Sequence, residues 1–263
     1  MADIHATAIV DPKAQIGANV KIGPYCIIGP KVALGDDCEL KSHVVIDGNT
    51  TIGPRAQIFP FASLGQQPQD LKYHGEESRL EIGADAVIRE YVTMNTGTEG
   101  GGMLTKVGDT CVALSSVHIG HDCNIGNGVI LSSGALLAGH CRVDDHVIFG
   151  GGAAVHQFVR IGRNAFIGGA SAVEGDIIPF GLVVGNRANL MGLNLVGLKR
   201  HQFSRERIFA LRDAYGQIFD DKAIPLRERV AAVAGRFADQ ADVMEIVNFI
   251  QSASDRPLCL PAR

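Results

Sequence analysis

The segment QIGANVKIGPYCIIGPKVALGDDCEL, residues 15–40, decides the fold because it repeats one short pattern. A small or β-branched residue stands four places after an aliphatic one, and the aliphatic residue recurs at every sixth position: Ile16, Ile22, Ile28, Leu34 and Leu40. A period of six fits neither a helix nor a single alternating strand. It is typical of a parallel β-helix, in which three hexads, each with one short strand, form one coil.

The same period continues on both sides of this segment. It reaches back to Ile4 and on to Leu64, resumes at Ile82, and continues with one shift to Val173. Chance placement of apolar residues would almost never produce so long a series. Neighbouring coils pair at the strand spacing of about 4.8 Å, so roughly ten coils predict a prism about 45–50 Å long.

Five of the six cysteines occupy the small-residue position of the repeat, and only Cys259 lies outside it. No C-x-x-C motif occurs. Cysteines spaced by the repeat indicate small buried apolar residues rather than metal ligands or disulfides. They are Cys26, Cys38, Cys111, Cys123 and Cys141.

Two polar segments interrupt the repeat, residues 66–81 and residues 95–106. The first preserves the register, since Leu64 and Ile82 are three hexads apart, and the second shifts it by one residue. Loops on a rigid scaffold often carry binding residues. The glycines of the second loop lack the G-K-[ST] ending of a phosphate-binding loop, so we do not expect one there.

The repeat fades after Pro179, and helical periodicity begins at Ser204, a suitable N-cap. We therefore expect a mainly β protein of two domains: a left-handed parallel β-helix over residues 1–190 and an α-helical domain over residues 191–263. The handedness comes from the resemblance described below, because the general rule for crossovers favours the right hand.

Composition excludes several classes of protein. The 263 residues are 46% hydrophobic with a formal net charge of −4, so a packed core is possible and a basic nucleic-acid-binding face is not expected. No run of 18 apolar residues predicts a membrane-spanning helix. The N-terminal MADIHATAIVDPK resembles no secretory signal, so we expect a cytoplasmic protein.

Histidines cluster in the second half of the repeat, at His118, His121, His140 and His156. Gly139 follows His121 by three hexads, which predicts that it lies one coil away at the same corner. Neutral histidine can act as a general base near pH 7. Two other interpretations remain open: surface or interface histidines, and a metal site formed by His118, His121 and His140.

Two charged segments are further candidates. Asp70 and Lys72 lie in the first loop, and either bind a ligand or form a solvated loop. The segment 193–207 contains a basic cluster, which suits an anionic partner or a solvated helix start. Its members are Lys199, Arg200, Arg205 and Arg207.

The chain resembles the UDP-N-acetylglucosamine O-acyltransferase family. The motifs that carry the resemblance are LKSHVVIDG (40–48), QDLKYHGE (69–76), GGGMLTKVG (100–108), HIGHDC (118–123), LAGH (137–140), AAVHQF (153–158) and GLNLVGLKR (192–200). The hexapeptide repeat alone is shared by many acyltransferases, whereas these motifs in this order are much more specific.

The resemblance implies a homotrimer with active sites between neighbouring prisms. It implies transfer of an (R)-3-hydroxyacyl group from acyl carrier protein to the 3-hydroxyl of UDP-N-acetylglucosamine, which begins lipid A synthesis. No metal and no bound cofactor is expected, because the thioester arrives on the phosphopantetheine of the carrier protein. The basic segment then suits that acidic carrier.

The resemblance also implies roles for individual residues. His121 would be the general base, Asp122 would orient it, and the backbone N–H of Gly139 would stabilise the oxyanion. Gly169 would lie near the end of the acyl groove, where glycine leaves room for a long chain. The expected contacts to the nucleotide sugar or the acyl donor are Gln69, Asp70, Lys72, His118, His140, His156, Gln157, Asn194 and Arg200.

Three positions depart from the family pattern: Asn95 stands where many relatives have His, Val196 replaces an acidic residue, and His201 replaces Arg. A 3-amino analogue of the sugar therefore stays open as acceptor. A trimeric, metal-dependent carbonic anhydrase on the same fold is the alternative from another class.

Overall fold

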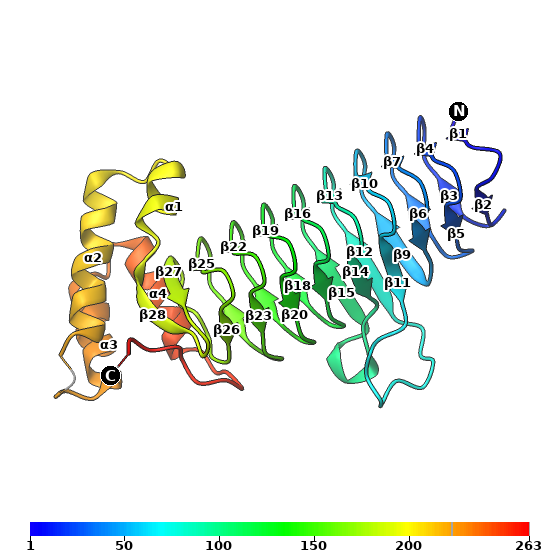
Figure 1. Ribbon diagram of the computed structural model, residues 1–263. Coiled ribbons are helices and arrows are strands. Elements are labelled where there is room, and N and C mark those ends of the chain that lie inside the picture. Colours follow the sequence, from blue (N-terminus) through cyan, green and yellow to red (C-terminus); the bar gives the residue numbers. More distant parts are fainter. Residues whose placement is uncertain (222, 263) are drawn as a thin grey trace.

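The chain winds into a three-sided prism whose sides are parallel β-sheets, followed by helices at one end (Figure 1). The computed structural model describes residues 1–221 and 223–262. Each strand pairs with the third strand along the chain, so β1 pairs with β4 and β4 with β7. This is the predicted mainly β class with a parallel β-helix.

We name the three sides faces A, B and C. Face A contains β1 (Asp3–Ile4), β4 (Lys21–Ile22), β7 (Glu39–Leu40), β10 (Gln57–Ile58), β13 (Val87–Ile88), β16 (Val112–Ala113), β19 (Ile130–Leu131), β22 (Ile148–Phe149), β25 (Phe166–Ile167), β27 (Gly181–Val184) and β28 (Asn189–Leu193). Face B contains β2 (Ile9–Val10), β5 (Ile27–Ile28), β8 (Val45–Ile46), β11 (Ser63–Gln66), β14 (Thr93–Asn95), β17 (His118–Ile119), β20 (Leu136–Leu137), β23 (Ala154–Val155) and β26 (Ala172–Val173). Face C contains β3 (Gln15–Ile16), β6 (Ala33–Leu34), β9 (Asn49–Ile52), β12 (Arg79–Ile82), β15 (Leu104–Val107), β18 (Asn124–Ile125), β21 (Arg142–Val143) and β24 (Arg160–Ile161).

The register of the strands confirms the predicted coil of three hexads. Ile4 pairs with Ile22, and Leu137 pairs with Val155. The first loop keeps the hexad register, with Ile52 opposite Ile82. The second shifts it by one residue, with Met94 opposite Ile119.

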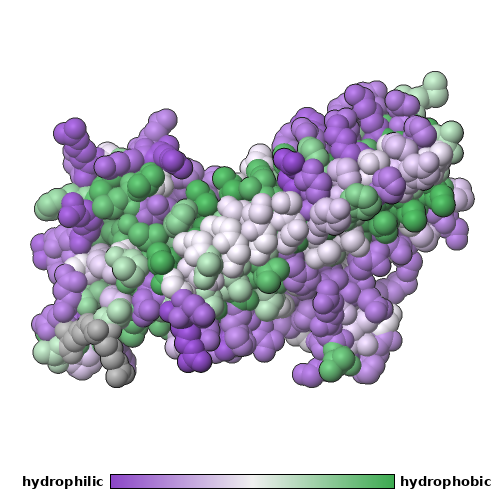
Figure 2. All heavy atoms as spheres, in the orientation of Figure 1, coloured by the Kyte–Doolittle hydropathy of each residue, from purple (hydrophilic) through white to green (hydrophobic). Residues whose placement is uncertain are grey.

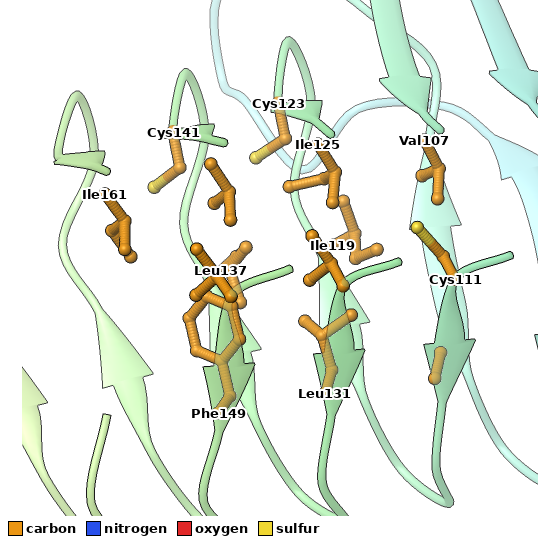
Figure 3. Packing of buried hydrophobic residues seen from close by; sticks show 14 of the residues in the cluster. Val107, Cys111, Ile119, Cys123, Ile125, Leu131, Leu137, Cys141, Phe149 and Ile161 are labelled. Carbon is orange, nitrogen blue, oxygen red and sulfur yellow. The ribbon is translucent and has the colours of Figure 1, made fainter. Parts of the chain in front are cut away.

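The interior is filled by the aliphatic residues and by the small residues of the repeat (Figure 3). All six cysteines are free and buried, which confirms the prediction for the five that lie in the repeat. The Cys123 thiol donates a hydrogen bond to the carbonyl of Ala138 at 3.2 Å. Burial raises the pKa of the Cys111 thiol to about 11, so this side chain behaves as a small neutral group.

The corners between strands depend on left-handed backbone conformations. Asp122, His140 and Phe158 follow one another at intervals of one coil, with φ of 59°, 63° and 66°. This conformation costs roughly 1–2 kcal/mol for an L-residue. The coil-to-coil hydrogen bonds on both sides hold these residues there, so their side chains form a column along the corner between faces B and C.

Both loops leave the prism at this same corner, on successive coils (Figure 1). They are shorter than predicted, because β12 begins at Arg79 and β15 at Leu104, and the observed loops are 67–78 and 96–103. Each loop leads directly into a four-residue strand of face C, the first into β12 and the second into β15. The loops also contact each other, since Ser78 Oγ donates to Thr96 Oγ1 at 2.9 Å.

The C-terminal part contains α1 (Leu195–Arg200), α2 (Arg205–Phe219), α3 (Leu226–Arg236) and α4 (Ala241–Gln251). Ser204 caps α2 as predicted, whereas α1 was not expected. The predicted division after residue 190 falls inside β28, which pairs antiparallel with β27 on face A. The hairpin therefore carries the last sheet of the prism across that boundary.

No helix of the described residues is both long enough and apolar enough to cross a membrane.

Replacing Phe149 with Ala should lower the free energy of unfolding by about 3–5 kcal/mol, because its ring is fully buried and leaves a cavity. Urea denaturation followed by circular dichroism measures the loss. Phe209→Ala is the control: its ring on α2 is 72% exposed, and a change within about 0.5 kcal/mol is expected. Equal losses in the two variants would contradict this account of the core.

Candidate active site

The candidate site lies at the corner between faces B and C, next to the two loops. His121 and Asp122 form the corner after β17, and Gly139 and His140 form the next one after β20. The coil places these pairs in contact, as the spacing of His121 and Gly139 predicted. Thr98, in the loop 96–103, covers the corner from outside.

Asp122 is the centre of a dense set of hydrogen bonds. Its side chain is fully buried, and its carboxylate accepts from His121 Nδ1 at 2.8 Å. It also accepts from the Thr98 amide at 2.8 Å and from the Thr98 hydroxyl at 2.6 Å. Burial alone would raise the pKa of Asp122, but the hydrogen bonds from His121 and Thr98 outweigh it and lower this pKa. The buried carboxylate therefore stays ionised at neutral pH.

The ionised carboxylate determines which nitrogen of His121 carries the proton. A carboxylate only accepts hydrogen bonds, so His121 Nδ1 is the donor and Nε2 is left as a free acceptor. The ring lies directly against Gly139: a Cβ at that glycine would be 2.5 Å from His121 Cε1 and 2.6 Å from Nε2. Only glycine leaves room for the imidazole here.

The backbone amide of Gly139 has no hydrogen-bond partner among the described residues. Gly139 directly precedes the left-handed residue His140, and Pro24 and Pro60 hold the equivalent position before Tyr25 and Phe61 at the corner between faces A and B. Proline fits there because no amide donor is needed. At Gly139 the free N–H is instead available beside the His121 ring.

His140 forms the other wall of the site. Its Nδ1 lies 3.7 Å from Asp122 Oδ2, and its ring meets His121 edge-on with centroids 4.9 Å apart. On the other side it stacks on Phe158 at 4.4 Å and 4°. Burial lowers the pKa of His140, and the negative charge of Asp122 only partly offsets this effect. Asp70 raises this pKa and Lys72 lowers it, both by smaller amounts.

His118 points outward from face B beside the corner. Its Nδ1 lies 2.8 Å from Thr93 Oγ1, and burial, with a smaller contribution from His121, lowers its pKa. Among the described residues, the ligand atoms close enough to hold a metal belong to His121, Asp122 and His140, all within 4.8 Å. His118, which the alternative metal site required, is not in that group.

His156 and Gln157 lie on the next coil but outside this cluster. Arg256, from the C-terminal segment, contacts His156 Nδ1 at 2.6 Å and donates to the Gln157 carbonyl at 2.8 Å. In one copy of the chain, His156 is therefore not part of the group formed by His121, Asp122 and His140. His156 falls one position short of two full coils after His121, so Phe158 takes the position next to His140.

The predicted loop residues are near the site without being fixed by it. Gln69 and Lys72 are exposed, and Asp70 accepts a hydrogen bond from the Lys72 amide at 3.0 Å. The effect of Asp70 and Lys72 on the pKa of His140 places the loop 67–78 within electrostatic range of the corner. Asn95 is buried below this loop and donates to the carbonyls of Gln66 and Gln67 at 3.4 and 3.0 Å.

The other predicted residues lie several coils away. Asn194 is buried and caps α1, donating to the Asn164 carbonyl at 2.9 Å. Arg200 is exposed on the same helix and lines an apolar groove of about 440 Å³ with Val196 and Phe166. His201, at the end of α1, contacts the ring of His146 with centroids 4.8 Å apart.

Gly169 lies at the corner between faces A and B and is exposed. A Cβ there would be 3.3 Å from the carbonyl oxygen of Gly151, one coil earlier. Glycines thus follow each other along this corner, while the other predicted substrate contacts lie on other sides of the prism. One copy of the chain does not bring the whole predicted set together.

Sequence reasoning missed three residues of the corner: Thr98, Thr105 and Phe158. Phe158 could have been found, because it follows His140 by one coil length. Thr105 accepts from the Asp122 amide at 2.7 Å, and Thr98 reaches Asp122 across a loop. No spacing rule relates a loop residue to the coil that it covers.

Comparison with known proteins agrees with this architecture. A sequence profile for bacterial transferase hexapeptides (six repeats) matches residues 13–48, which places the fold in the hexapeptide-repeat transferase class. A second profile, described as UDP N-acetylglucosamine O-acyltransferase, domain 2, matches residues 176–259.

Two relatives named acyl-(acyl-carrier-protein)–UDP-N-acetylglucosamine O-acyltransferase are similar over nearly their whole length. The protein of Rickettsia peacockii (strain Rustic) is 52% identical over 258 residues, 98% of this chain and 97% of the relative. That of Azorhizobium caulinodans is 50% identical over 262 residues, 97% and 96% of the two chains. The chain belongs to the UDP-N-acetylglucosamine O-acyltransferase family.

Solved structures agree in three dimensions. A crystal structure of UDP-N-acetylglucosamine acyltransferase superposes with a TM-score of 0.95 at 41% identity, covering 99% of this chain and 100% of that one. The Campylobacter jejuni enzyme gives 0.92 at 35% identity, covering 99% and 100%. A mirror-image coil could not superpose in this way, so the coil has the family's hand, which the resemblance gives as left-handed.

The lowered pKa of His118 predicts acid sensitivity. Unfolded histidine titrates near pH 6.5, so below that pH the unfolded chain binds a proton that the native site resists. The neutral, buried His118 therefore leaves the free energy of unfolding undiminished above about pH 6.5 and lowers it as the pH falls below that value. His118→Gln should lose less stability than the parent between pH 7.5 and 5.5, measured by urea denaturation. An identical loss in both proteins would contradict the burial effect.

Proposed function

We propose that this protein transfers an (R)-3-hydroxyacyl group from acyl carrier protein to the 3-hydroxyl of UDP-N-acetylglucosamine, the step that begins lipid A synthesis. The names of its relatives support the acceptor and the carrier-bound donor. The observation that supports the chemistry is the pair His121–Asp122 with a free Nε2 beside an unpaired backbone N–H.

In the proposed mechanism, His121 is the general base. Its Nε2 takes the proton of the sugar 3-hydroxyl while that oxygen attacks the thioester carbonyl. Asp122 accepts the Nδ1 proton in a hydrogen bond and stabilises the imidazolium that forms, which keeps the ring in one tautomer and orientation. When the tetrahedral intermediate collapses, the ester forms, the carbon–sulfur bond breaks, and the imidazolium returns its proton to the leaving thiolate.

The proposed oxyanion donor is the Gly139 amide. It lies beside the His121 ring, so a carbonyl carbon attacked near Nε2 would have its oxygen near this N–H. Removing one such donor costs about 3–4 kcal/mol of transition-state stabilisation in comparable enzymes. The absence of a side chain at Gly139 serves both the ring and the incoming carbonyl.

The remaining residues are proposed substrate contacts. Gln69, Asp70 and Lys72 on the loop 67–78 would hold the nucleotide sugar, together with His118 and His140 at the corner. His156, Gln157, Asn194 and Arg200 would contact the donor or the nucleotide. Within one copy of the chain, His156 contacts Arg256, and Asn194 accepts a hydrogen bond from the Gly197 amide of α1.

Gly169 is proposed to border the acyl groove. Its exposed position and the adjacent Gly151 leave a smooth corner between faces A and B, where a long chain could lie. The chemistry needs no metal and no bound cofactor, because the thioester is already activated and His121 supplies the base. The relatives are named O-acyltransferases, which favours the hydroxyl acceptor over the 3-amino analogue.

We also propose that the protein acts as a homotrimer, with face B as a principal contact surface. The outward residues of the nine strands of face B include no Asp, Glu, Lys or Arg: Ile9, Ile27, Val45, Ser63, Thr93, His118, Leu136, Ala154 and Ala172. Face C instead presents charged residues such as Glu81, Lys106 and Arg142. Figure 2 shows weakly polar surface along the middle of the prism and strongly polar surface at its lower edge.

A row of exposed rings on the corner between faces A and B supports this proposal. Tyr25, His43, Phe61 and Tyr91 stack with centroids 5.0, 5.0 and 5.1 Å apart, although the two tyrosines are 58% exposed and Phe61 48%. Exposed apolar patches of this kind usually contact a partner. A closed ring of identical chains needs two different surfaces per copy, which faces A and B can supply.

Phe61→Glu should weaken this assembly, because it places charge inside the row of rings. Analytical ultracentrifugation should give a mass near three times 27.9 kDa for the parent and a lower mass, or concentration-dependent dissociation, for the variant. Phe209→Glu, at an exposed position on α2, is the matched control. A fully active monomeric parent would contradict the proposed trimer.

His121→Ala should reduce acyl transfer at least about 100-fold, the lower range for loss of a positioned base. The assay detects products by mass spectrometry, with hydroxyacyl carrier proteins of several lengths and with both UDP-N-acetylglucosamine and its 3-amino analogue. His5→Ala, an exposed histidine at the far end of the prism, is the control. A His121→Ala protein that keeps more than a tenth of the parent rate would refute the base.

The same assay separates the remaining alternatives. Product only with the amino analogue would assign the amide reaction and direct attention to Asn95 and Val196. Metal analysis of the purified protein, with a chelator arm in the assay, tests the cluster of His121, Asp122 and His140 as a metal site. Bound metal in a protein that gives no acyl-transfer product with either acceptor would favour the carbonic anhydrase type of site.

A further inference from the structure

We propose that the loop 96–103 is a positioning element for the His121–Asp122 pair, with Thr98 as its positioning residue and Gly101 as the position that gives Asp122 its space. This inference rests on the proposed function and extends it, because it assigns a role to a loop outside the coil that carries the pair.

Thr98 holds both oxygens of the carboxylate. Its amide donates to Asp122 Oδ1 at 2.8 Å, and its hydroxyl donates to Oδ2 at 2.6 Å. Oδ2 is also the oxygen that accepts from His121 Nδ1. The Thr98 hydroxyl and the imidazole thus share one acceptor atom, so a change at Thr98 acts directly on the bond that orients the base.

Thr98 is itself fixed by its own loop. Its carbonyl accepts from the amides of Gly101 and Met103, at 3.1 and 2.9 Å, and its side chain is buried. The loop thereby folds back over the carboxylate in a single short turn, Glu99–Gly101. The position of Asp122 depends on this turn as well as on its own corner.

Gly101 leaves open the space that the carboxylate occupies. A Cβ built there would be 2.0 Å from Asp122 Cγ and 2.3 and 2.4 Å from its oxygens. At Gly100, one residue earlier, a Cβ would meet nothing within 4 Å. A side chain at Gly101 would therefore collide with Asp122, whereas a side chain at Gly100 would not.

The charged and titratable groups around the pair come from several elements. His121 and His140 face Asp122 from the two corners, and His118 lies beside His121 on face B. A cavity of about 430 Å³ next to Asp122 is lined by Arg142 and Arg160 of face C and by Asp255 of the C-terminal segment. Asp70 and Lys72 act on His140 from the loop 67–78. Thr98 is neutral, so its effect on the carboxylate comes through hydrogen bonding alone.

Four variants test the proposal. Thr98→Val removes the hydroxyl donor at nearly constant volume, and Thr98→Ser retains it. Gly101→Ala places a methyl group against Asp122, and Gly100→Ala is its matched control. We measure kcat and KM against pH, and the titration of the Asp122 carboxyl carbon by ¹³C NMR.

Loss of a hydrogen bond to a charged group is worth about 1.5–3 kcal/mol, so kcat of Thr98→Val should fall roughly 10- to 100-fold, with KM for the nucleotide sugar changed less than about two-fold. Without the hydroxyl, the carboxylate binds a proton more readily and holds the imidazole less firmly in place. The Asp122 titration and the acid limb of the kcat/KM profile should both move to higher pH. Thr98→Ser should resemble the parent in all three measurements.

Gly101→Ala should lose activity more severely than Gly100→Ala, which should stay within about two-fold of the parent. The inference is overturned if Thr98→Val and Thr98→Ser have the same kcat, pH profile and Asp122 titration, or if the two glycine variants are equally active. The carboxyl titration needs no turnover. A parent protein without acyl transfer whose Asp122 titration still responds to Thr98→Val would refute the proposed function and uphold the positioning of Asp122.

Discussion

The whole architecture depends on the backbone hydrogen bonds that join each coil to the next. Because one coil consists of three hexads, a residue lies directly against its equivalent in the next coil, and every structural role becomes a column along the prism. The inward columns form the core, with Ile28 above Ile46 and Leu137 above Val155. The corner columns place side chains in line, which is how His121 comes to lie against Gly139. Residues of neighbouring coils can thus form a site when a few corner positions carry functional side chains in place of the usual residues of the repeat.

At the candidate site this rigidity supports a buried charge. An isolated carboxylate in a protein interior is costly, and it is tolerated when hydrogen-bond donors replace water. Asp122 receives three such bonds, from His121 and Thr98, and its own amide is held by Thr105. The left-handed backbone at Asp122 turns its side chain inward under the loop 96–103, while His121 keeps Nε2 toward Gly139. The same arrangement explains a lowered carboxyl pKa and a single imidazole tautomer.

The distribution of the remaining candidates follows from the shape of a prism. A three-sided rod has no deep interior cleft, so residues on different faces cannot converge within one copy. The corner with His121, the glycine corner with Gly169 and the groove beside α1 lie on different sides or at different coils. Convergence would require a neighbouring prism, and the uncharged outer surface of face B, with the stacked rings from Tyr25 to Tyr91, is where such a neighbour is proposed to pack.

The sequence by itself determined the coil, its register through both loops, the buried cysteines and the contact of His121 with Gly139, since all of these follow from counting in hexads and in coils of three hexads. It also determined the helix that begins after Ser204 through a capping residue and a periodic apolar face. Only the tertiary structure decided what covers the corner. Thr98 and Gly101 reach Asp122 from a loop that no period describes, β28 crosses the expected domain boundary as half of a hairpin, and His156 turns to Arg256, from a C-terminal segment 100 residues away. Periodic contacts are local in the repeat and can be read from spacing, whereas contacts of loops and chain ends depend on where the completed prism places them.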